Sequence, residues 1–385
     1  MAVNSGAGVP LCDLQAQYRE LQAELDAAVA RVLASGQVIL GPEVAALEAE
    51  VAAYCGVGYG VGCGSGTDAL SLALHALELG SGDEVILPAF TFFATAGSVS
   101  RTGARPVFCD IDPVTYNMDP IQVENKITPR TRAILVVHLF GQCADMQTLW
   151  TIAERHDLTL IEDAAQALGA EYQGKRAGSL GSLACLSFYP TKNLGAYGDA
   201  GMVVTSDPGW ANRMKCLRVH GMEPRYYHKH LGWNARIDAL HAAMLRVKLP
   251  HLERWIANRQ AVAARYDALI EEHHLSHFMK RPTRKPACRH TFNQYVVRIS
   301  HGQRDSLVRH LKAENIGCEI YYPLALHQQE CLRHLGYGTG DFPASEEAAG
   351  QVLALPIYPE LSSDQQRRVI QSCSAFLRQQ VRRAA

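Results

Sequence analysis

The chain reads Ser187-Phe188-Tyr189-Pro190-Thr191-Lys192-Asn193-Leu194-Gly195 where the apolar run 184–188 ends, and that run predicts a short strand. Glycines at 195, 198 and 201 favour a tight, closely packed loop. A lysine held in such a loop can act as an amine nucleophile if its surroundings lower its pKa. Lys192 is therefore a candidate catalytic residue, and a plain surface lysine stays open as the alternative.

A second apolar run ends in a carboxylate and reads Leu160-Ile161-Glu162-Asp163-Ala164-Ala165-Gln166. Asp163 suits either a helix N-cap or a carboxylate that keeps the pyridine nitrogen of a cofactor protonated. A lysine and an aspartate at two strand ends are what pyridoxal 5'-phosphate requires: a Schiff-base amine and a partner for the ring nitrogen. Gln166 is a candidate contact for the phenolic oxygen of that cofactor, or polar filler.

A glycine-rich turn lies between a predicted strand and a predicted helix and reads Gly62-Cys63-Gly64-Ser65-Gly66-Thr67-Asp68-Ala69. Free backbone N–H groups at a helix N-terminus bind phosphate, and glycines allow its close approach. Gly66 and Thr67 are candidate phosphate contacts, with Ser187 as a further donor. A plain capped turn is the alternative, because Ser65 and Thr67 are both capping residues.

Two other segments carry weaker signals. Phe92 follows a predicted strand, where its ring could stack on a planar cofactor, although taken alone a core position is favoured. The segment 232–238 opens a long helical pattern, and the planar fork of Arg236 suits a carboxylate or phosphate. A capped helix start with a solvated arginine explains that segment equally well.

The order of the patterns predicts an α/β fold with a mostly parallel seven-stranded sheet and a smaller C-terminal α/β domain. Continuous apolar runs such as 134–137 indicate a sheet that is covered on both faces. The predicted strands are 57–62, 84–89, 105–110, 133–139, 158–161, 184–188 and 201–205, and the intervening helices are 67–79, 91–101 and 145–156. Ligands bind at the carboxyl ends of such strands, where most of the candidate residues fall.

The C-terminal third begins with a long helical pattern over 238–274 that Pro250 should kink or break. We expect a disordered lead-in over 1–10, a large domain over 11–250 and a small domain over 251–385. The predicted elements of the small domain are strands over 294–299 and 318–322 and helices over 304–314 and 362–378.

Composition excludes several classes of protein. The 385 residues carry a formal net charge of -1, which gives no field that favours nucleic acid or an anionic membrane. No apolar run approaches the roughly 20 residues of a membrane span, and the N-terminus lacks the pattern of a signal peptide. The eleven cysteines form no C-x-x-C pair and no zinc spacing with histidines. We therefore expect a cytoplasmic protein with reduced thiols and no metal.

Taken together, these motifs resemble the DegT/StrS family of sugar aminotransferases over nearly the whole chain. Besides the stretches quoted above, the resemblance rests on the following segments: Gly36-Gln37-Val38-Ile39-Leu40-Gly41-Pro42, Gly82-Asp83-Glu84-Val85-Ile86, Val137-His138-Leu139-Phe140-Gly141 and Leu355-Pro356. The resemblance implies the fold of type I pyridoxal-phosphate enzymes and an obligate homodimer with shared active sites.

The resemblance also implies a role for each matching position. Lys192 matches the Schiff-base lysine, Asp163 the partner of the pyridine nitrogen and Gln166 the contact to the phenolic oxygen. The other matches are phosphate contacts at Gly66, Thr67 and Ser187, a stacking ring at Phe92, a phosphate ligand from the neighbouring subunit at Asn234 and a substrate-facing position at Arg236.

The implied activity is transfer of an amino group, with L-glutamate as donor, to a keto sugar linked to UDP or dTDP, either a ketohexose or a hexuluronate. The chain departs from the family at Tyr321-Tyr322-Pro323, where many members have His-Tyr-Pro near the sugar. That change leaves the identity of the sugar open. The alternatives are a sugar dehydratase with the same cofactor, in which a histidine would replace Lys192, and a non-catalytic sensor.

Overall fold

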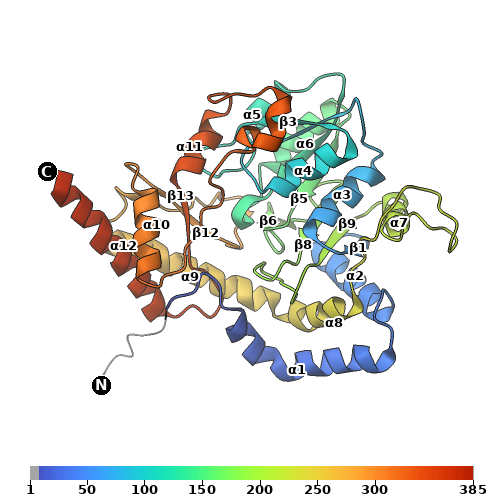
Figure 1. Cartoon of the computed structure of the whole chain (residues 1–385), viewed down its shortest axis with the longest axis horizontal. Coiled ribbons are helices and arrows are strands. Elements are labelled where there is room, and N and C mark those ends of the chain that lie inside the picture. The colour runs from blue at the N-terminus through green and yellow to red at the C-terminus, as the bar shows by residue number, and fades with distance from the viewer. Residues whose placement is uncertain (1–7, 385) are drawn as a thin grey trace.

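The computed structural model of the chain describes residues 8–384 (Figure 1). Its centre is a seven-stranded sheet with the strand order β1-β9-β8-β5-β4-β2-β3. The bounds of these strands are β1 Tyr59–Cys63, β2 Glu84–Pro88, β3 Arg105–Cys109, β4 Thr131–Val137, β5 Thr159–Asp163, β8 Leu183–Ser187 and β9 Gly201–Thr205. Strands β3, β2, β4, β5 and β8 run parallel, whereas β9 is antiparallel to both of its neighbours. The sheet is therefore mostly parallel, as the sequence predicts.

Two hydrophobic layers cover the two faces of this sheet, which explains why its strands are apolar along their whole length. Helices α2, α6 and α8 contribute to one layer, and α3, α4 and α7 to the other. The bounds of the helices around the sheet are α1 Leu14–Ser35, α2 Pro42–Cys55, α3 Gly66–Ala76, α4 Phe93–Thr102, α5 Pro120–Glu124, η1 Leu139–Gly141, α6 Met146–Arg155, α7 Pro208–Leu217 and α8 Ala239–Lys248.

Pro250 interrupts the long helical pattern as expected. Helix α8 ends at Lys248, a short 3-10 turn η2 spans Leu249–His251, and α9 continues over Leu252–Glu272. Figure 1 shows α9 leading from the seven-stranded sheet to the C-terminal elements.

The C-terminal part has its own hydrophobic cluster and a three-stranded antiparallel sheet with the order β10-β12-β13. Its elements are β10 Met279–Lys280, β12 Tyr295–Ile299, α10 Arg304–Ala313, η3 Leu326–Gln328, η4 Glu330–Leu335, α11 Pro343–Gln351, β13 Val352–Leu355 and α12 Ser363–Ala384. A third small sheet joins the two parts and consists of β6 Glu171–Tyr172, β7 Lys175–Arg176 and β11 Cys288–Arg289.

Two expectations about local structure are wrong. The segment 318–322 is not a strand, because within it only Glu319 pairs, in an isolated bridge with Ala354. The lead-in expected to be disordered over 1–10 includes Val9, which is buried and pairs with Ile316. Residues 1–7 of that lead-in lie outside the described residues.

Within the described part of the chain, no helix combines the length with the apolar content that a bilayer span requires. The same residues bring no three metal-ligating side chains together, and the eleven cysteines are free thiols.

Candidate active site

A cavity of about 480 Å³ opens at the carboxyl ends of β2, β4, β5 and β8. Nine of the predicted site residues line it: Gly66, Thr67, Phe92, Asp163, Gln166, Ser187, Lys192, Tyr321 and Tyr322. The cavity thus brings together segments that are up to 256 residues apart, as the topology of an open α/β sheet predicts.

Lys192 is half-buried in the loop that follows β8. Two backbone hydrogen bonds close this loop, from Lys192 N–H to the Tyr189 carbonyl at 2.8 Å and from Ala196 N–H to the Phe188 carbonyl at 2.7 Å. Burial lowers the pKa of the Lys192 ammonium to about 8, against the opposing charge of Asp163. An amine with this pKa offers far more free base near neutral pH than an ordinary lysine does.

Asp163 ends β5 and is buried. Its Oδ2 accepts a hydrogen bond from Thr95 Oγ1 at 2.8 Å, and its Oδ1 accepts one from Ala165 N–H at 3.2 Å. Burial raises the pKa of the Asp163 carboxyl, whereas these two hydrogen bonds and the charge of Lys192 oppose that rise. The residues after Asp163 form turns and no helix, so the role of helix N-cap does not apply.

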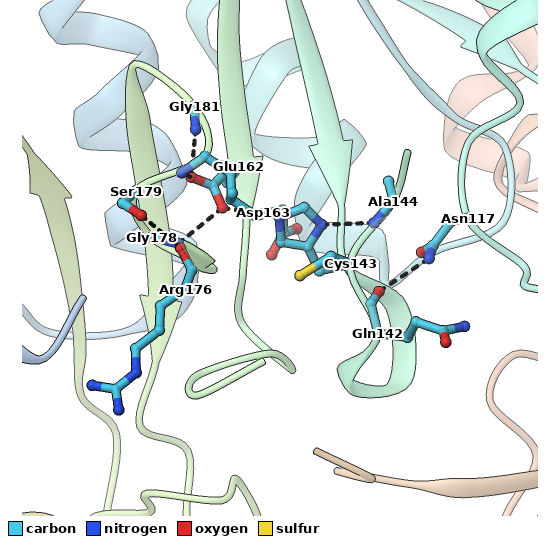
Figure 2. A network of polar contacts seen from close by, with 12 residues as sticks. Asn117, Gln142, Cys143, Ala144, Glu162, Asp163, Arg176, Gly178, Ser179 and Gly181 are labelled. Carbon is cyan, nitrogen blue, oxygen red and sulfur yellow. Dashed lines mark hydrogen bonds and ion pairs between the residues drawn. The ribbon is translucent and has the colours of Figure 1, made fainter. Parts of the chain in front are cut away.

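Glu162, the neighbour of Asp163, is the centre of a buried polar network (Figure 2). Its carboxylate accepts backbone hydrogen bonds from Gly178, Leu180 and Gly181 at 2.6–2.9 Å. His138 Nδ1 accepts the Ala144 N–H at 3.2 Å, so its Nε2 carries the proton and donates to Glu162 at 2.9 Å. The network fixes the end of β5 against two loops.

The amide of Gln166 has both of its ends engaged. Its Oε1 accepts the Phe140 N–H at 2.7 Å, and its Nε2 donates to Tyr322 Oη at 3.0 Å. The Phe140 contact fixes which end of the amide faces Tyr322, and the Tyr322 hydroxyl keeps its own proton to donate. Gln166 and Tyr322 therefore present hydrogen-bond donors to the same side of the cavity.

The glycine-rich turn and β8 form a cradle for an anion. Helix α3 begins at Gly66, and its first N–H groups have no acceptor within the helix. Ser65 caps the helix by accepting the Asp68 N–H at 3.0 Å. A Cβ added to Gly66 would lie 2.8 Å from the Cβ of Ser187, so only glycine lets these two segments meet.

Phe92 lies at the mouth of the cavity with 55% of its surface exposed. The core position favoured by the residue type alone is therefore wrong. Its ring centroid lies 6.0 Å from that of Tyr322, at an interplanar angle of 37°. An exposed ring beside a cavity is suited to cover a planar ligand.

Asn234 and Arg236 do not line the cavity of the same chain. Asn234 is exposed, and its Oδ1 accepts a hydrogen bond from Arg236 Nε at 2.8 Å. Between them, the Ala235 carbonyl accepts the Gly64 N–H at 3.2 Å, which ties this segment to the outside of the glycine-rich turn.

Sequence reasoning missed several residues of the site. Thr95 donates a hydrogen bond to Asp163, and His138 lies near that carboxylate. The cavity lining also includes Tyr189, Asp199 and Gln294. Thr95 lies three residues after Phe92 on a predicted helix, and that spacing places both on one face. No local pattern assigns a site role to the others, because their partners lie far away in the sequence.

The residues present fit pyridoxal phosphate on structural grounds. The cavity holds an amine with a lowered pKa, a buried carboxylate with hydrogen-bond capacity left on both oxygens, a glycine-lined helix N-terminus and an exposed ring. A larger, more open hollow of about 640 Å³ near Glu84 and Arg105 contains no predicted site residue.

Comparison with known proteins gives a family and close relatives. The profile of the DegT/DnrJ/EryC1/StrS aminotransferase family matches residues 19–374. The chain is 49% identical to a pleiotropic regulatory protein of Geobacillus stearothermophilus, over 96% of this chain and 99% of the relative. It is 43% identical to the UDP-N-acetyl-3-dehydro-alpha-D-glucosamine 3-aminotransferase of Acidithiobacillus ferrooxidans, over 95% of this chain and 97% of that protein.

Among solved structures, the chain is similar to DesV of S. venezuelae, with a TM-score of 0.92 and 45% identity. The match covers 96% of this chain and 98% of DesV. The similarity therefore extends over nearly the whole length of both chains.

Proposed function

This chain belongs to the DegT/DnrJ/EryC1/StrS aminotransferase family, and from that premise we propose that it aminates a keto sugar carried on UDP or dTDP, with L-glutamate as the donor. It is an aminotransferase that uses pyridoxal phosphate. The observation that carries the proposal is the single cavity that contains both Lys192 and Asp163. The similarity to the Acidithiobacillus enzyme, whose name specifies a UDP-linked 3-keto sugar, supports the substrate class.

Pyridoxal phosphate, when bound, supplies an aldehyde that condenses with amines and a ring that withdraws electrons from the carbon beside the nitrogen. Lys192 holds the aldehyde through its Nζ. The free Nζ of Lys192 would take the proton from the donor Cα as a general base and return a proton as a general acid. Its pKa of about 8 suits both directions of transfer near neutral pH.

The remaining cavity residues bind and orient the cofactor in this proposal. Asp163 pairs with the protonated ring nitrogen, and Gln166 donates its Nε2 hydrogen to the phenolic oxygen. Phe92 covers one face of the ring. The N-terminus of α3, with Gly66, Thr67 and Ser187, would hold the phosphate.

The proposal includes a homodimer with shared active sites, located in the cytoplasm. Asn234 and Arg236 lie outside the cavity of their own chain, and this placement supports their donation to the site of a second copy. In that arrangement Asn234 binds phosphate and Arg236 faces the substrate. A large domain over 11–250 and a small domain over 251–385 are part of the same proposal.

Tyr321 and Tyr322 form the wall of the cavity from the C-terminal part and are proposed to contact the sugar. Arg236 suits a uronic acid or a nucleotide phosphate, so both ketohexoses and hexuluronates belong in a substrate panel.

The experiment is a two-step half-reaction followed by absorbance. Protein loaded with pyridoxal phosphate should change its spectrum when L-glutamate is added and regain it when a suitable UDP- or dTDP-linked keto sugar follows. A panel of such sugars identifies the substrate. No spectral change with glutamate would rule out the proposed donor, and recovery with none of the sugars would rule out the acceptor class.

The same experiment separates the alternatives. A dehydratase would release a deoxy sugar without stoichiometric glutamate. A purely regulatory role, suggested by the name of the Geobacillus relative, predicts no glutamate-dependent change at all. The retention of Lys192 and Asp163 in one cavity argues against both.

A further inference from the structure

Thr95, near the start of α4, makes a contact with Asp163 that no sequence motif predicts. Its side chain is buried with 0% exposure, and its Oγ1 lies 2.8 Å from Asp163 Oδ2. The two residues are 68 positions apart, so the contact depends on the packing of α4 against the carboxyl end of β5.

The donors and acceptors in this contact follow from the chemistry. An ionised carboxylate only accepts hydrogen bonds, so the Thr95 hydroxyl must donate to Asp163. The Thr95 oxygen is then free to accept from Thr91 Oγ1 at 3.2 Å. The result is a directed chain of hydroxyls that runs from Thr91, on the cavity wall, through Thr95 to Asp163.

The two oxygens of Asp163 are held from different sides. Thr95 holds Oδ2, and the Ala165 N–H holds Oδ1. With two anchors the carboxylate cannot rotate about χ2 without losing a hydrogen bond in a buried site, which is costly. Without the Thr95 hydroxyl only the Ala165 N–H would remain.

The same turn of α4 carries the exposed ring at the cavity mouth. Phe92 is the N-cap residue of α4, and its carbonyl accepts the Thr95 N–H at 3.2 Å. One helical turn therefore sets the position of a cavity-wall ring and of the group that holds Asp163.

We infer that Thr95 is a positioning residue that fixes the Asp163 carboxylate in the orientation required by the pyridine nitrogen of pyridoxal phosphate. The inference rests on the proposed role of Asp163. Helix α4 then contributes to cofactor binding through Thr95 as well as through Phe92 at its N-cap.

The inference predicts an effect on pH dependence. The groups that face Asp163 from the surrounding elements are Lys192, His138, Tyr322 and Cys185. The hydrogen bond from Thr95 opposes the rise in the pKa of Asp163 that burial causes. Removing it raises that pKa further, so the carboxylate becomes protonated at a higher pH and cofactor affinity falls earlier on acidification.

The test compares three variants of the full chain. Thr95→Val replaces the hydroxyl with a methyl group of similar size, and Thr95→Ser keeps the hydroxyl. Thr102→Val is the matched control, since its hydroxyl donates to the Val99 carbonyl on the same helix at 2.8 Å. The readouts are the dissociation constant of pyridoxal phosphate as a function of pH, the absorbance of the bound cofactor and the melting temperature.

We expect Thr95→Val to weaken cofactor binding at neutral pH by roughly tenfold or more and to move the acidic limb of the affinity profile to higher pH. Thr95→Ser should restore affinity to within about twofold, and Thr102→Val should leave affinity and profile unchanged. If Thr95→Val does not fold, Thr95→Ala, which is smaller, replaces it in the comparison.

Two results would overturn the inference: wild-type affinity and pH profile in Thr95→Val, or equal losses in the Thr95→Val and Thr102→Val proteins. Asp163→Asn separates this failure from failure of the proposed function. If Asp163→Asn weakens cofactor binding and Thr95→Val does not, only the role of Thr95 is wrong. If neither does, the role of Asp163 itself fails.

Discussion

Lys192 and Lys248 occupy different regions of the molecule, yet burial lowers the pKa of each ammonium to about 8. Lys192 opens onto the cavity beside Asp163. Lys248, at the end of α8, is 1% exposed, donates from Nζ to the Gly195 carbonyl at 2.5 Å and lies 4.3 Å from the ring centroid of Tyr197. A lowered pKa thus identifies a buried amine, and access to a cavity identifies a reactive one.

The two lysines are nevertheless connected. The carbonyl that Lys248 binds belongs to Gly195, three residues after Lys192 in the same loop. A Cβ at Gly195 would collide with the Pro190 carbonyl oxygen, so the loop is folded tightly on itself. Lys248 therefore supports the loop that presents Lys192, and the predictions below separate support from chemistry.

The largest effect is expected for Lys192→Ala. Removing the amine removes both the covalent hold on the cofactor and the general base, so the glutamate half-reaction should slow by at least roughly 10³-fold. Stopped-flow absorbance measures this rate. Lys192→Arg keeps a charge without a free amine at neutral pH and should be equally inactive; turnover near the wild-type rate in either protein would contradict the role.

Asp163→Asn should have the next largest effect. The amide cannot hold the ring nitrogen in its charged form, so we expect a loss of roughly 10²-fold in the glutamate half-reaction together with weaker cofactor binding. Kinetics and cofactor titration of the same preparation measure both. Asp199→Asn, which changes an exposed carboxylate that also lines the cavity, is the comparison for a general effect of charge.

Lys248→Met should lower activity by about tenfold at most and act chiefly on stability. The variant leaves the Gly195 carbonyl without its donor in a buried site, at a cost of about 1–3 kcal/mol in the free energy of unfolding. Borohydride treatment followed by peptide mapping should attach the cofactor to Lys192 in wild type and variant alike. Labelling of Lys248 in the wild-type protein would contradict its assignment as a supporting residue without a chemical role.

The smallest effect concerns pH. The folded-state pKa of Lys248, about 8, lies below the ordinary value of 10.5, so between these values the unfolded state binds more protons and stability rises with pH. Relative to Lys248→Met, the wild-type protein should gain about 2 kcal/mol in unfolding free energy from pH 8 to pH 10. Urea unfolding at both values measures the difference, and a constant difference would show that folding does not lower the pKa of Lys248.

The sequence predicts what depends on local pattern. Apolar runs bounded by glycines or prolines predicted the seven central strands and the break at Pro250. They also predicted that Lys192 and Asp163 follow or end strands, and both residues line one cavity. The prediction of a strand over 318–322 was wrong, because its apolar residues pack against the hydrophobic cluster around Phe90 and Phe140, and only Glu319 pairs with the sheet of the C-terminal part.

Contacts between segments that are far apart in the sequence could not be predicted from local sequence patterns. The sequence assigns no site role to Thr95 or His138, and they gain their roles only when α4 and the end of β4 lie beside β5. For Phe92 the residue type alone was misleading. A phenylalanine favours the core, but the place of Phe92 at a helix N-cap beside the cavity leaves it exposed.

The pairing of β8 with β9 has a practical consequence for engineering. Ser187 and Gly201 lie directly opposite each other at the last rung of that antiparallel ladder, so the thirteen residues between them leave and rejoin the sheet at one point. Both ends of this loop are therefore anchored at the same place in the sheet. A loop from a relative that is joined at this rung must keep Lys192 and the tight fold at Gly195.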